Sequence, residues 1–264
     1  MTERPAFSSF SFPAVPGGAI LCAGLLLDTD APRPAVFFRH VTESERARAA
    51  RFRREEDALR HLAGRALVRR VLQAALGQDA IGDFPPTPLG KPRYPGADMH
   101  FSISHSGGMV WAAFCRAAPV GIDVEESRPL PDLERLAASL HPEEAASLRR
   151  LPPEERTRAF YRCWTRKEAV LKADGSGLSV SLDSFQVRTD AARANWIVSL
   201  PATFLPPQKP PRQSERHTRD KGEPVASPAT WTARDIIPAM PGYHCGVAAC
   251  APHLAVSTVI LEGI

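Results

Sequence analysis

Residues 164–178 read Trp-Thr-Arg-Lys-Glu-Ala-Val-Leu-Lys-Ala-Asp-Gly-Ser-Gly-Leu. A helix here places Trp164, Glu168 and Lys172 on one face, because they recur at i, i+4 and i+8. The glycines after Asp174 predict a sharp helix end where backbone can approach a ligand. An exposed Glu168–Lys172 ion pair is the simpler interpretation. The large indole ring beside the pair favours the wall of a partly buried pocket instead.

Residues 120–125 read Val-Gly-Ile-Asp-Val-Glu and predict a strand. Alternate side chains of a strand face the same way, so the three aliphatic residues face the core while Asp123 and Glu125 share the other face. Two neighbouring carboxylates repel each other unless they are solvated or hold a cation. This pair alone is compatible with a solvated strand face. With Glu168 as a third carboxylate, a magnesium site becomes the better interpretation.

Basic and hydroxyl side chains accompany these carboxylates. Only 5 of the 33 Lys and Arg residues are lysines, and Lys91, Lys167 and Lys172 are three of them. A lysine is a compact point charge, unlike the flat guanidinium of arginine. The turn at 104–108, Ser-His-Ser-Gly-Gly, supplies hydroxyls, an imidazole and backbone N–H groups suited to a phosphate. Alone, each of these features is also compatible with an ordinary surface loop.

Composition sets the broad class of the protein. The 264 residues allow one large domain or two smaller ones, and 44% hydrophobic content is enough for a core. The five cysteines form no Cys-x-x-Cys pair, which favours free thiols in a reducing cytoplasm. The apolar run at 19–27 is shorter than the roughly 20 residues that cross a membrane. No basic segment precedes this run, so it does not resemble a signal peptide. We therefore expect a buried strand in a cytoplasmic protein.

The order of the predicted elements indicates an α+β chain in which each half, 1–118 and 119–264, could form a small α+β unit, although no internal sequence repeat shows a duplication. Thr42 and Glu45 form a capping box at the start of a helical region that runs, with one break, to Gly77. The other elements expected in the first half are a strand over 19–27, a loop over 82–98, and strands over 99–104 and 109–115. Those expected in the second half are strands over 120–125, 185–188, 196–200, 231–237 and 243–250 and helices over 131–139, 142–150 and 154–173.

Two further segments stand out. Residues 206–228 have almost no apolar content, which predicts a flexible insertion. Residues 46–70 are rich in arginine, which fits a solvated helix face or an anion site. A nucleic-acid interface is disfavoured, because Phe52 offers no interleaved aromatic platform and acidic residues 55–57 interrupt the charge. The net charge of +4 is too small to argue for nucleic acid by itself.

Several motifs, taken in order, resemble the signature of the 4′-phosphopantetheinyl transferases, in their larger, surfactin-type branch. The motifs are Glu-Asp-Ala-Leu-Arg at 56–60, Gly-Lys-Pro at 90–92, Phe-Ser-Ile-Ser-His-Ser-Gly-Gly at 101–108, Gly-Ile-Asp-Val-Glu at 121–125, and the stretch at 164–178. The resemblance covers roughly 42–190 and extends weakly through 241–243.

The resemblance implies two similar α+β halves in one chain, with the active site in the cleft between them. It implies transfer of the phosphopantetheine arm of coenzyme A to a serine of an acyl or peptidyl carrier protein, with release of adenosine 3′,5′-bisphosphate. Asp123, Glu125 and Glu168 would then bind Mg²⁺. Glu168 would also act as the catalytic base, and Lys172 would stabilise or protonate the leaving phosphate.

The resemblance also implies a set of residues that contact coenzyme A. These are Arg48, Arg60, Lys91, Ser104, His105 and Lys167. The chain departs from the family at Glu45, where a lysine is frequent and for which Arg46 is a candidate substitute, and in its insertion at 206–228. Glu144 would lie near the metal by its position.

Other interpretations remain open at this point. A non-catalytic coenzyme A or carrier-binding module is the main alternative to the transferase. We expect a monomer, because two fused halves suffice for a site, and neither a nucleic-acid nor a membrane partner. The residues do not indicate which class of carrier protein is used.

Overall fold

The structure is a computed structural model that describes residues 7, 11–30, 32–95, 98–204 and 230–261. The insertion expected over 206–228 lies outside these residues. The strands are β1 (Ala19–Leu26), β2 (His100–Ser106), β3 (Met109–Cys115), β4 (Val120–Glu126), β5 (Gln186–Val187), β6 (Ile197–Ser199), β7 (Thr232–Ile236), β8 (Tyr243–Ala249) and β9 (Ala255–Leu261). The α-helices are α1 (Glu43–Ala49), α2 (Glu55–Leu76), α3 (Leu133–Ala137), α4 (Pro142–Arg150) and α5 (Pro153–Asp174). Short 3₁₀ helices are η2 (Pro34–His40), η3 (Gly177–Ser179), η4 (Leu182–Ser184) and η5 (Ala202–Phe204).

The first helical region follows its sequence signals. Thr42 accepts a hydrogen bond from the Glu45 N–H while the Glu45 carboxylate accepts from the Thr42 N–H, so the capping box is confirmed. The expected break falls between α1 and α2. Gly77 ends α2 with φ of 63°, a left-handed conformation that glycine adopts without strain.

The N-terminal sheet has the strand order β2-β3-β1-β9, and α2 packs across one face of it. Strands β2 and β3 form an antiparallel hairpin, and its connection is shorter than the segment 105–108 left between the two predicted strands. Ser106 pairs with Met109, so Gly107 and Gly108 alone make the turn, with φ of 52° at Gly107. His105 and Ser106 therefore lie on β2, where every second side chain shares a face.

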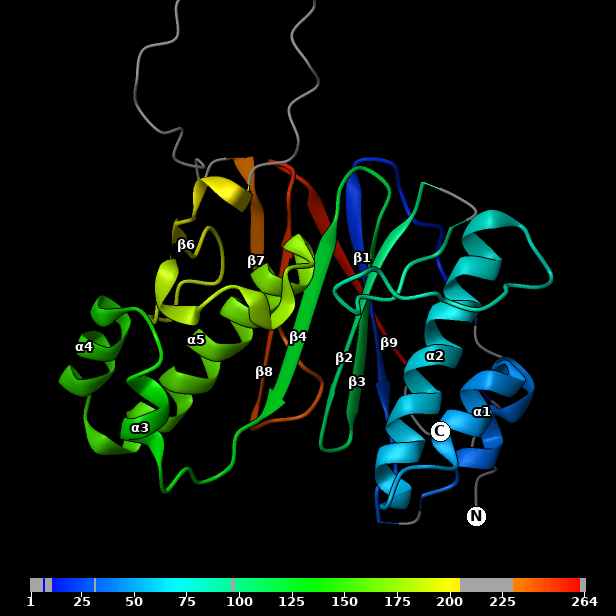
Figure 1. The fold of residues 1–264 in the computed structure, drawn as a ribbon, viewed down its shortest axis with the longest axis horizontal. Helices are drawn as coiled ribbons and strands as arrows, with labels where there is room; N and C mark the ends of the chain where they lie inside the picture. The colour runs from blue at the N-terminus through cyan, green and yellow to red at the C-terminus, as the bar shows by residue number, and fades with distance from the viewer. Residues whose placement is uncertain (1–6, 8–10, 31, 96–97, 205–229, 262–264) are drawn as a thin grey trace, which may run out of the picture.

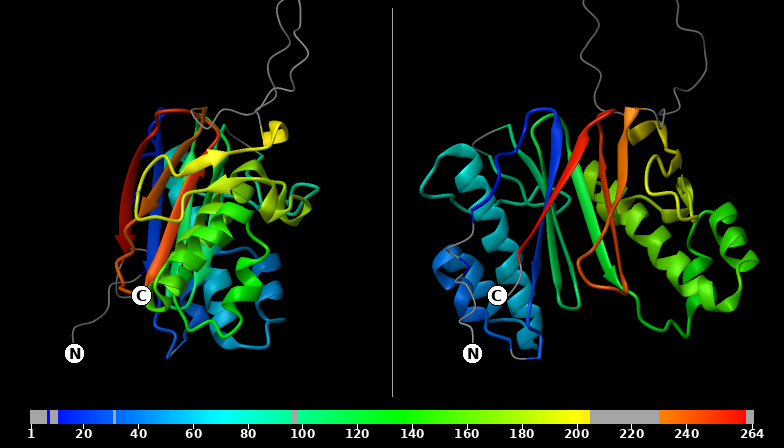
Figure 2. Two further views of the ribbon diagram at one scale, coloured as in Figure 1. Left: turned by 90° about the vertical axis from the view of Figure 1, so that its left-hand side faces the viewer. Right: turned by 180° about the vertical axis from the view of Figure 1, so that it is seen from behind.

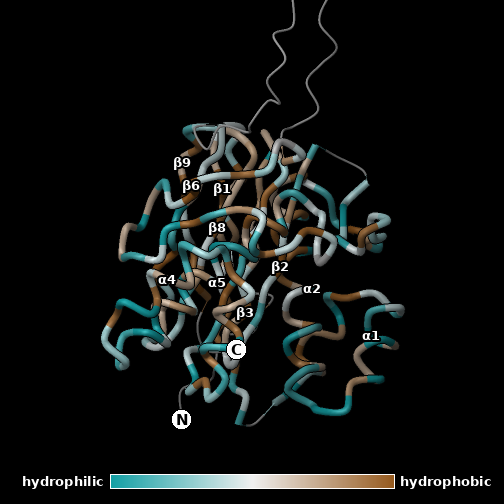
Figure 3. Tube along the Cα trace, turned by 60° about the vertical axis from the view of Figure 1, so that its left-hand side comes forward, coloured by the Kyte–Doolittle hydropathy of each residue, from teal (hydrophilic) through white to brown (hydrophobic). Residues whose placement is uncertain are grey.

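The C-terminal sheet has the order β4-β8-β7 and is covered by α5. A Cβ atom at Gly121 would meet the backbone of Ala169 and Ala173, so glycine permits this close helix–strand contact. Val120, Ile122 and Val124 face the core between the sheets, as the alternation of β4 predicts. The trace in Figure 3 is largely brown, or hydrophobic, along the central strands and teal over many of the outer loops.

The two halves meet along their sheets. Each half places one 22-residue helix, α2 or α5, on a sheet, and both helices lie on the same side of the molecule (Figures 1 and 2). The α+β class with two halves is thus confirmed. Strand β9, which the sequence did not predict, crosses back and pairs in parallel with β1 of the first half. The boundary at 118/119 stays a prediction.

Candidate active site

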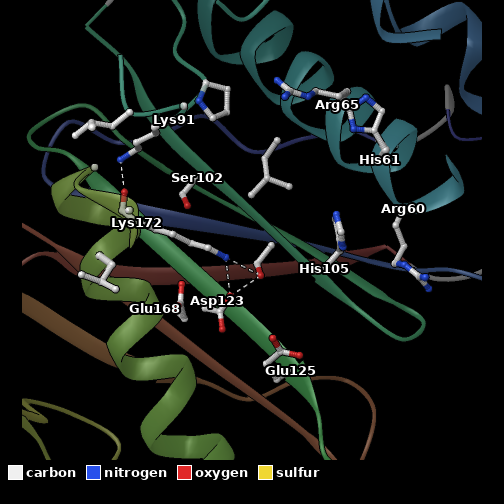
Figure 4. Close-up of a pocket in the computed structure, with 18 of the residues that line it drawn as sticks. Arg60, His61, Arg65, Lys91, Ser102, His105, Asp123, Glu125, Glu168 and Lys172 are labelled. Atoms are coloured by element: carbon white, nitrogen blue, oxygen red, sulfur yellow. Dashed lines mark hydrogen bonds and ion pairs between the residues drawn. The ribbon is translucent and has the colours of Figure 1, made fainter. Parts of the chain in front are cut away.

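A cavity of about 640 Å³ lies between α2, β2, β4 and the C-terminal half of α5. It is lined from one side by the face of α5 that carries Trp164, Glu168 and Lys172, as the helical spacing predicts. Strand β4 contributes Asp123 and Glu125, and α2 forms the opposite wall (Figure 4). The cavity therefore lies where the two halves meet.

Three carboxylates line this cavity. Asp123 is 3% exposed, and its Oδ1 accepts hydrogen bonds from Lys172 Nζ at 2.6 Å and Ser104 Oγ at 2.7 Å. Burial raises the pKa of Glu168, and the charge of Asp123 adds to the rise. Burial likewise raises the pKa of Glu125, partly opposed by its hydrogen bond from Ser106. Both shifts come mainly from burial, and the charge of Asp123 adds to each of them.

The donor set fits a magnesium ion. Asp123 Oδ2 is buried and has no hydrogen-bond partner within the described part of the chain, although a buried carboxylate oxygen normally has one. In the described residues no three His, Cys, Asp or Glu side chains are already grouped at metal-binding distance. A metal held by all three carboxylates therefore requires side-chain rotation. Oxygen ligands from one or two carboxylates, completed by phosphates and water, are what Mg²⁺ prefers.

Lys172 reaches from α5 to the carboxylates of β4. Its ammonium group bonds to Asp123 and, at 3.0 Å, to Ser104, while 31% of the side chain stays exposed. An ammonium group has three N–H donors. The third N–H has no partner among the residues described and is available to a ligand in the cavity.

Lys91 has a different place from the one expected. Its Nζ donates to the carbonyls of Lys172 at 2.5 Å, Val120 at 3.1 Å and Ala173 at 3.3 Å. Burial lowers its pKa to about 8, opposed by the charge of Asp174. The side chain lines the cavity, but its three donors are already used at the C-terminal end of α5, where carbonyls are unpaired and cations are favoured.

The wall from α2 is cationic. Arg60 lines the cavity as predicted and is fixed by hydrogen bonds to Asp57 Oδ1 at 2.6 Å and the Gly107 carbonyl at 3.0 Å. His61 and Arg65 also line it and were missed by the sequence reasoning, although their i, i+4 spacing places them on one helix face. His61 Nε2 is buried without a hydrogen-bond partner among described residues, and burial lowers the pKa of His61 to about 4, with the charge of Arg65 contributing.

His105 and Arg48 were both predicted to contact coenzyme A, but only His105 lies at the cavity. His105 lines the cavity, and burial lowers its pKa, with Lys172 and Arg60 adding to the shift. Arg48 is exposed on α1 and does not line the cavity, but its charge helps lower the pKa of Arg65. Its expected contact with coenzyme A stays a prediction.

Lys167 is the predicted site residue that the structure places elsewhere. It is completely buried, and its Nζ donates to the carbonyls of Leu182 at 2.7 Å and Phe185 at 2.6 Å. It also forms an ion pair with Glu144 Oε1 at 3.0 Å. The reason is geometric: neighbouring residues of a helix point about 100° apart, so Lys167 faces the C-terminal core when Glu168 faces the cavity. This corrects the expectations for both Lys167 and Glu144.

The departure at Glu45 also has a structural explanation. Its carboxylate is buried and pairs with Arg69, at 2.8 Å between Nη1 and Oε2, while it caps α1. Arg46 donates to the Phe38 carbonyl at 2.9 Å and does not line the cavity. Arg46 therefore does not take the place of a phosphate-binding lysine in this structure, whereas Arg65 lies at the cavity.

Comparison with known proteins identifies the family of the chain. Residues 119–226 match the model of the 4′-phosphopantetheinyl transferase superfamily, and residues 32–116 match that of the 4′-phosphopantetheinyl transferase N-terminal domain. The chain is 39% identical over 155 residues to 4′-phosphopantetheinyl transferase Sfp of Bacillus subtilis, covering 58% of this chain and 68% of the relative. It is 38% identical over 171 residues to 4′-phosphopantetheinyl transferase HetI of a Nostoc species, covering 62% and 72%.

A third relative, 4′-phosphopantetheinyl transferase AcpT of Salmonella typhimurium, is 36% identical over 127 residues, covering 47% of this chain and 63% of the relative. The matched segments thus span about two thirds of the length of these relatives. The chain belongs to the 4′-phosphopantetheinyl transferase superfamily. Its activity is 4′-phosphopantetheinyl transfer to carrier proteins, for which the family uses coenzyme A.

Proposed function

We propose that the cavity between α2 and α5 binds coenzyme A and that Asp123, Glu125 and Glu168 hold Mg²⁺ there during transfer to a carrier serine. The observation that carries this proposal is the buried Asp123 Oδ2, which lacks a hydrogen-bond partner in the described chain and lies in a cavity with two further carboxylates. A divalent cation satisfies that oxygen and offsets the mutual repulsion of the three charges. When bound, Mg²⁺ would neutralise the diphosphate oxygens of coenzyme A.

The reaction replaces one phosphorus–oxygen bond with another. The serine oxygen of the carrier forms a bond to the β-phosphorus of coenzyme A. The bond from this phosphorus to the bridging oxygen breaks, and adenosine 3′,5′-bisphosphate leaves. Protein groups contribute to such a transfer mainly by positioning and electrostatic stabilisation.

Glu168 is the group that accepts the serine proton. It lies on the cavity wall and forms no hydrogen bond with another described side chain, so its carboxylate oxygens are open to a substrate. Burial and the charge of Asp123 raise its pKa, which makes the ionised form a stronger base. The carboxylate therefore combines access to the cavity with increased basicity.

Lys172 acts at the leaving group. Lys172 lines the cavity, and its third N–H, which has no partner among the described residues, can donate to an oxygen of the departing phosphate. A charge-assisted hydrogen bond of this kind strengthens as negative charge develops on the leaving oxygen. The bond to Asp123 holds the ammonium group in place before the substrate arrives.

The α2 wall supplies the contacts for the remaining phosphate of coenzyme A. Arg60, His61 and Arg65 line the cavity opposite the carboxylates, and His105 adds an imidazole from β2 (Figure 4). Arg65 carries N–H groups without a hydrogen bond to any described acceptor, so its guanidinium can bind a phosphate bidentately. Because the carboxylates lie on one wall and the arginines on the other, a bound nucleotide would place its metal-binding diphosphate and its remaining phosphate toward opposite walls.

The structure has no helix, over the residues it describes, that is long and apolar enough to cross a membrane. A cytoplasmic location, a monomeric state and the use of acyl or peptidyl carrier proteins stay predictions. The alternative of a binding module without catalysis differs from the transferase in one measurable respect, because only the transferase modifies the carrier.

Intact-protein mass spectrometry tests the proposal. Purified enzyme, coenzyme A and Mg²⁺ are incubated separately with three apo carrier proteins, one each from fatty acid, polyketide and nonribosomal peptide assembly. We expect the mass gain of one phosphopantetheine on at least one carrier. The variants Asp123→Ala and Glu168→Gln should lower the rate by about 100-fold or more, the range for loss of a general base or of a metal-dependent step. Normal turnover by both variants would refute the metal assignment.

A further inference from the structure

Three serines occupy every second position of β2. Their hydroxyl oxygens accept hydrogen bonds from every second backbone N–H of β4: Ser102 from Ile122 at 3.2 Å, Ser104 from Val124 at 3.2 Å, and Ser106 from Glu126 at 3.1 Å. The two strands belong to different sheets and are not paired through their backbones. This serine ladder, residues 102, 104 and 106, therefore joins the two halves of the molecule beside the cavity.

The hydroxyl protons of Ser104 and Ser106 have defined acceptors. A serine hydroxyl has one hydrogen and two lone pairs. Ser104 donates to Asp123 Oδ1 at 2.7 Å and accepts from both the Val124 N–H and Lys172 Nζ, so its capacity is filled. Ser106 donates to Glu125 Oε2 at 2.7 Å and accepts from the Glu126 N–H. Ser104 therefore has no proton left for a phosphate, which differs from its expected contact with coenzyme A.

We propose that Ser104 and Ser106 are positioning residues, which fix the carboxylates of Asp123 and Glu125 so that the second oxygen of each is left for the metal. This inference rests on the proposed metal site. Side chains alternate with a period of two residues in both β2 and β4. Ser104 binds the N–H of Val124 and the carboxylate of the preceding residue, Asp123. Ser106 in the same way binds the N–H of Glu126 and the carboxylate of Glu125. The bonded oxygens are Oδ1 and Oε2, and Asp123 Oδ2 is the buried oxygen without a partner among described atoms.

The third serine provides a matched control. Ser102 makes the same kind of hydrogen bond to β4, but the residue one before Ile122 is Gly121. No carboxylate fits there, because a Cβ atom at Gly121 would meet the backbone of α5. Ser102→Ala and Ser106→Ala thus remove the same contact between the halves, while Ser106→Ala alone releases a carboxylate.

The test measures metal binding without turnover. Mn²⁺ serves as the probe, with coenzyme A present and no carrier, and free Mn²⁺ is counted by electron paramagnetic resonance against a protein-free blank. We expect Ser106→Ala to weaken Mn²⁺ binding about tenfold, the lower end of the effect of removing a hydrogen-bond partner of a metal ligand. Ser102→Ala and Ser106→Thr, which keeps the hydroxyl, should bind Mn²⁺ like the wild type. Ser106→Cys replaces the alanine variant if that variant does not fold, and its weak donor should also weaken binding.

The outcomes separate this inference from the proposed function. Equal Mn²⁺ binding by Ser106→Ala and wild type, or equal weakening by Ser102→Ala and Ser106→Ala, would overturn the positioning role. If Asp123→Ala still abolishes transfer in those cases, the proposed metal site stands. If the wild type transfers nothing to any carrier while only Ser106→Ala weakens Mn²⁺ binding, the positioning role stands and the proposed function fails.

Discussion

Replacing Lys167 with methionine separates a structural role from a ligand role for this side chain. The substitution keeps most of the volume and removes the ammonium group. Glu144, 1% exposed, then loses its counter-charge and keeps the backbone N–H donors of Val187 at 2.7 Å and His141 at 3.0 Å. The carbonyls of Leu182 and Phe185 lose the ammonium donor at the same time.

The expected effect on stability is large. Removing one partner of a buried ion pair costs about 3–5 kcal/mol, because a buried charge loses its counter-charge. Each kcal/mol lowers Tm by about 2–4 °C in chains somewhat smaller than this one, so we expect Lys167→Met to lower Tm by about 10 °C. Below the new Tm, the affinity for coenzyme A should stay near the wild-type value, since Lys167 does not line the cavity.

Thermal unfolding and isothermal titration calorimetry with coenzyme A measure the two effects. Lys172→Met is the matched control on the same helix, because its side chain is 31% exposed and lines the cavity. Its pair with Asp123 is partly exposed to solvent and Asp123 keeps its bond from Ser104, so Lys172→Met should lower Tm less than Lys167→Met, and it should lose turnover. A double variant with Glu144→Gln should be less destabilised than the sum of the single variants, by about 0.5–3 kcal/mol. A normal Tm with lost coenzyme A binding in Lys167→Met would refute the structural role.

Two further predictions concern the walls of the cavity. The pKa of Lys91 is about 8 in the folded chain, below its usual 10.5, so between these values the unfolded chain binds more protons. Stability therefore rises with pH in this window relative to Lys91→Met. Denaturant unfolding at pH 7.5 and 10 measures the difference, and an equal difference at both pH values contradicts the assignment. Arg65→Ala should weaken coenzyme A binding about 10-fold or more, which is the loss in affinity expected when one charge-assisted hydrogen bond is removed. The affinity for 3′-dephospho-coenzyme A should stay unchanged. Equal loss for both ligands would place the contact at the diphosphate.

The sequence predicted the elements whose signals are local. The capping box at Thr42, the helix end at Gly77 and the alternation of β4 each depend on residues within one turn or one strand, and all three are confirmed. The face of α5 with Trp164, Glu168 and Lys172 was predictable for the same reason, since it follows from helical spacing alone.

The remainder depends on contacts between distant segments. Strand β9 was missed because its pairing with β1 joins residues more than 230 positions apart. The prediction for Lys167 was wrong because a sequence motif specifies residue types but not the direction of each side chain. The 100° rotation between neighbouring helical residues decides which side chain reaches the cavity. Its partner Glu144 comes from another helix, α4, and no spacing along the chain indicates that pair.

The position of the site follows from how the sheets are joined. Neighbouring strands of one sheet are joined by hydrogen bonds between backbone N–H and C=O groups. Between β2 and β4 the connection is made by serine hydroxyl groups instead. Polar side chains are therefore required at this junction, at every second residue of β2. The carboxylates of β4 lie beside those hydroxyls, on the side of the sheets that α2 and α5 flank. A catalytic site at the junction therefore uses side chains that also join the halves, and substitutions of Ser104 or Ser106, which bond to both strand and carboxylate, should change metal binding and stability together.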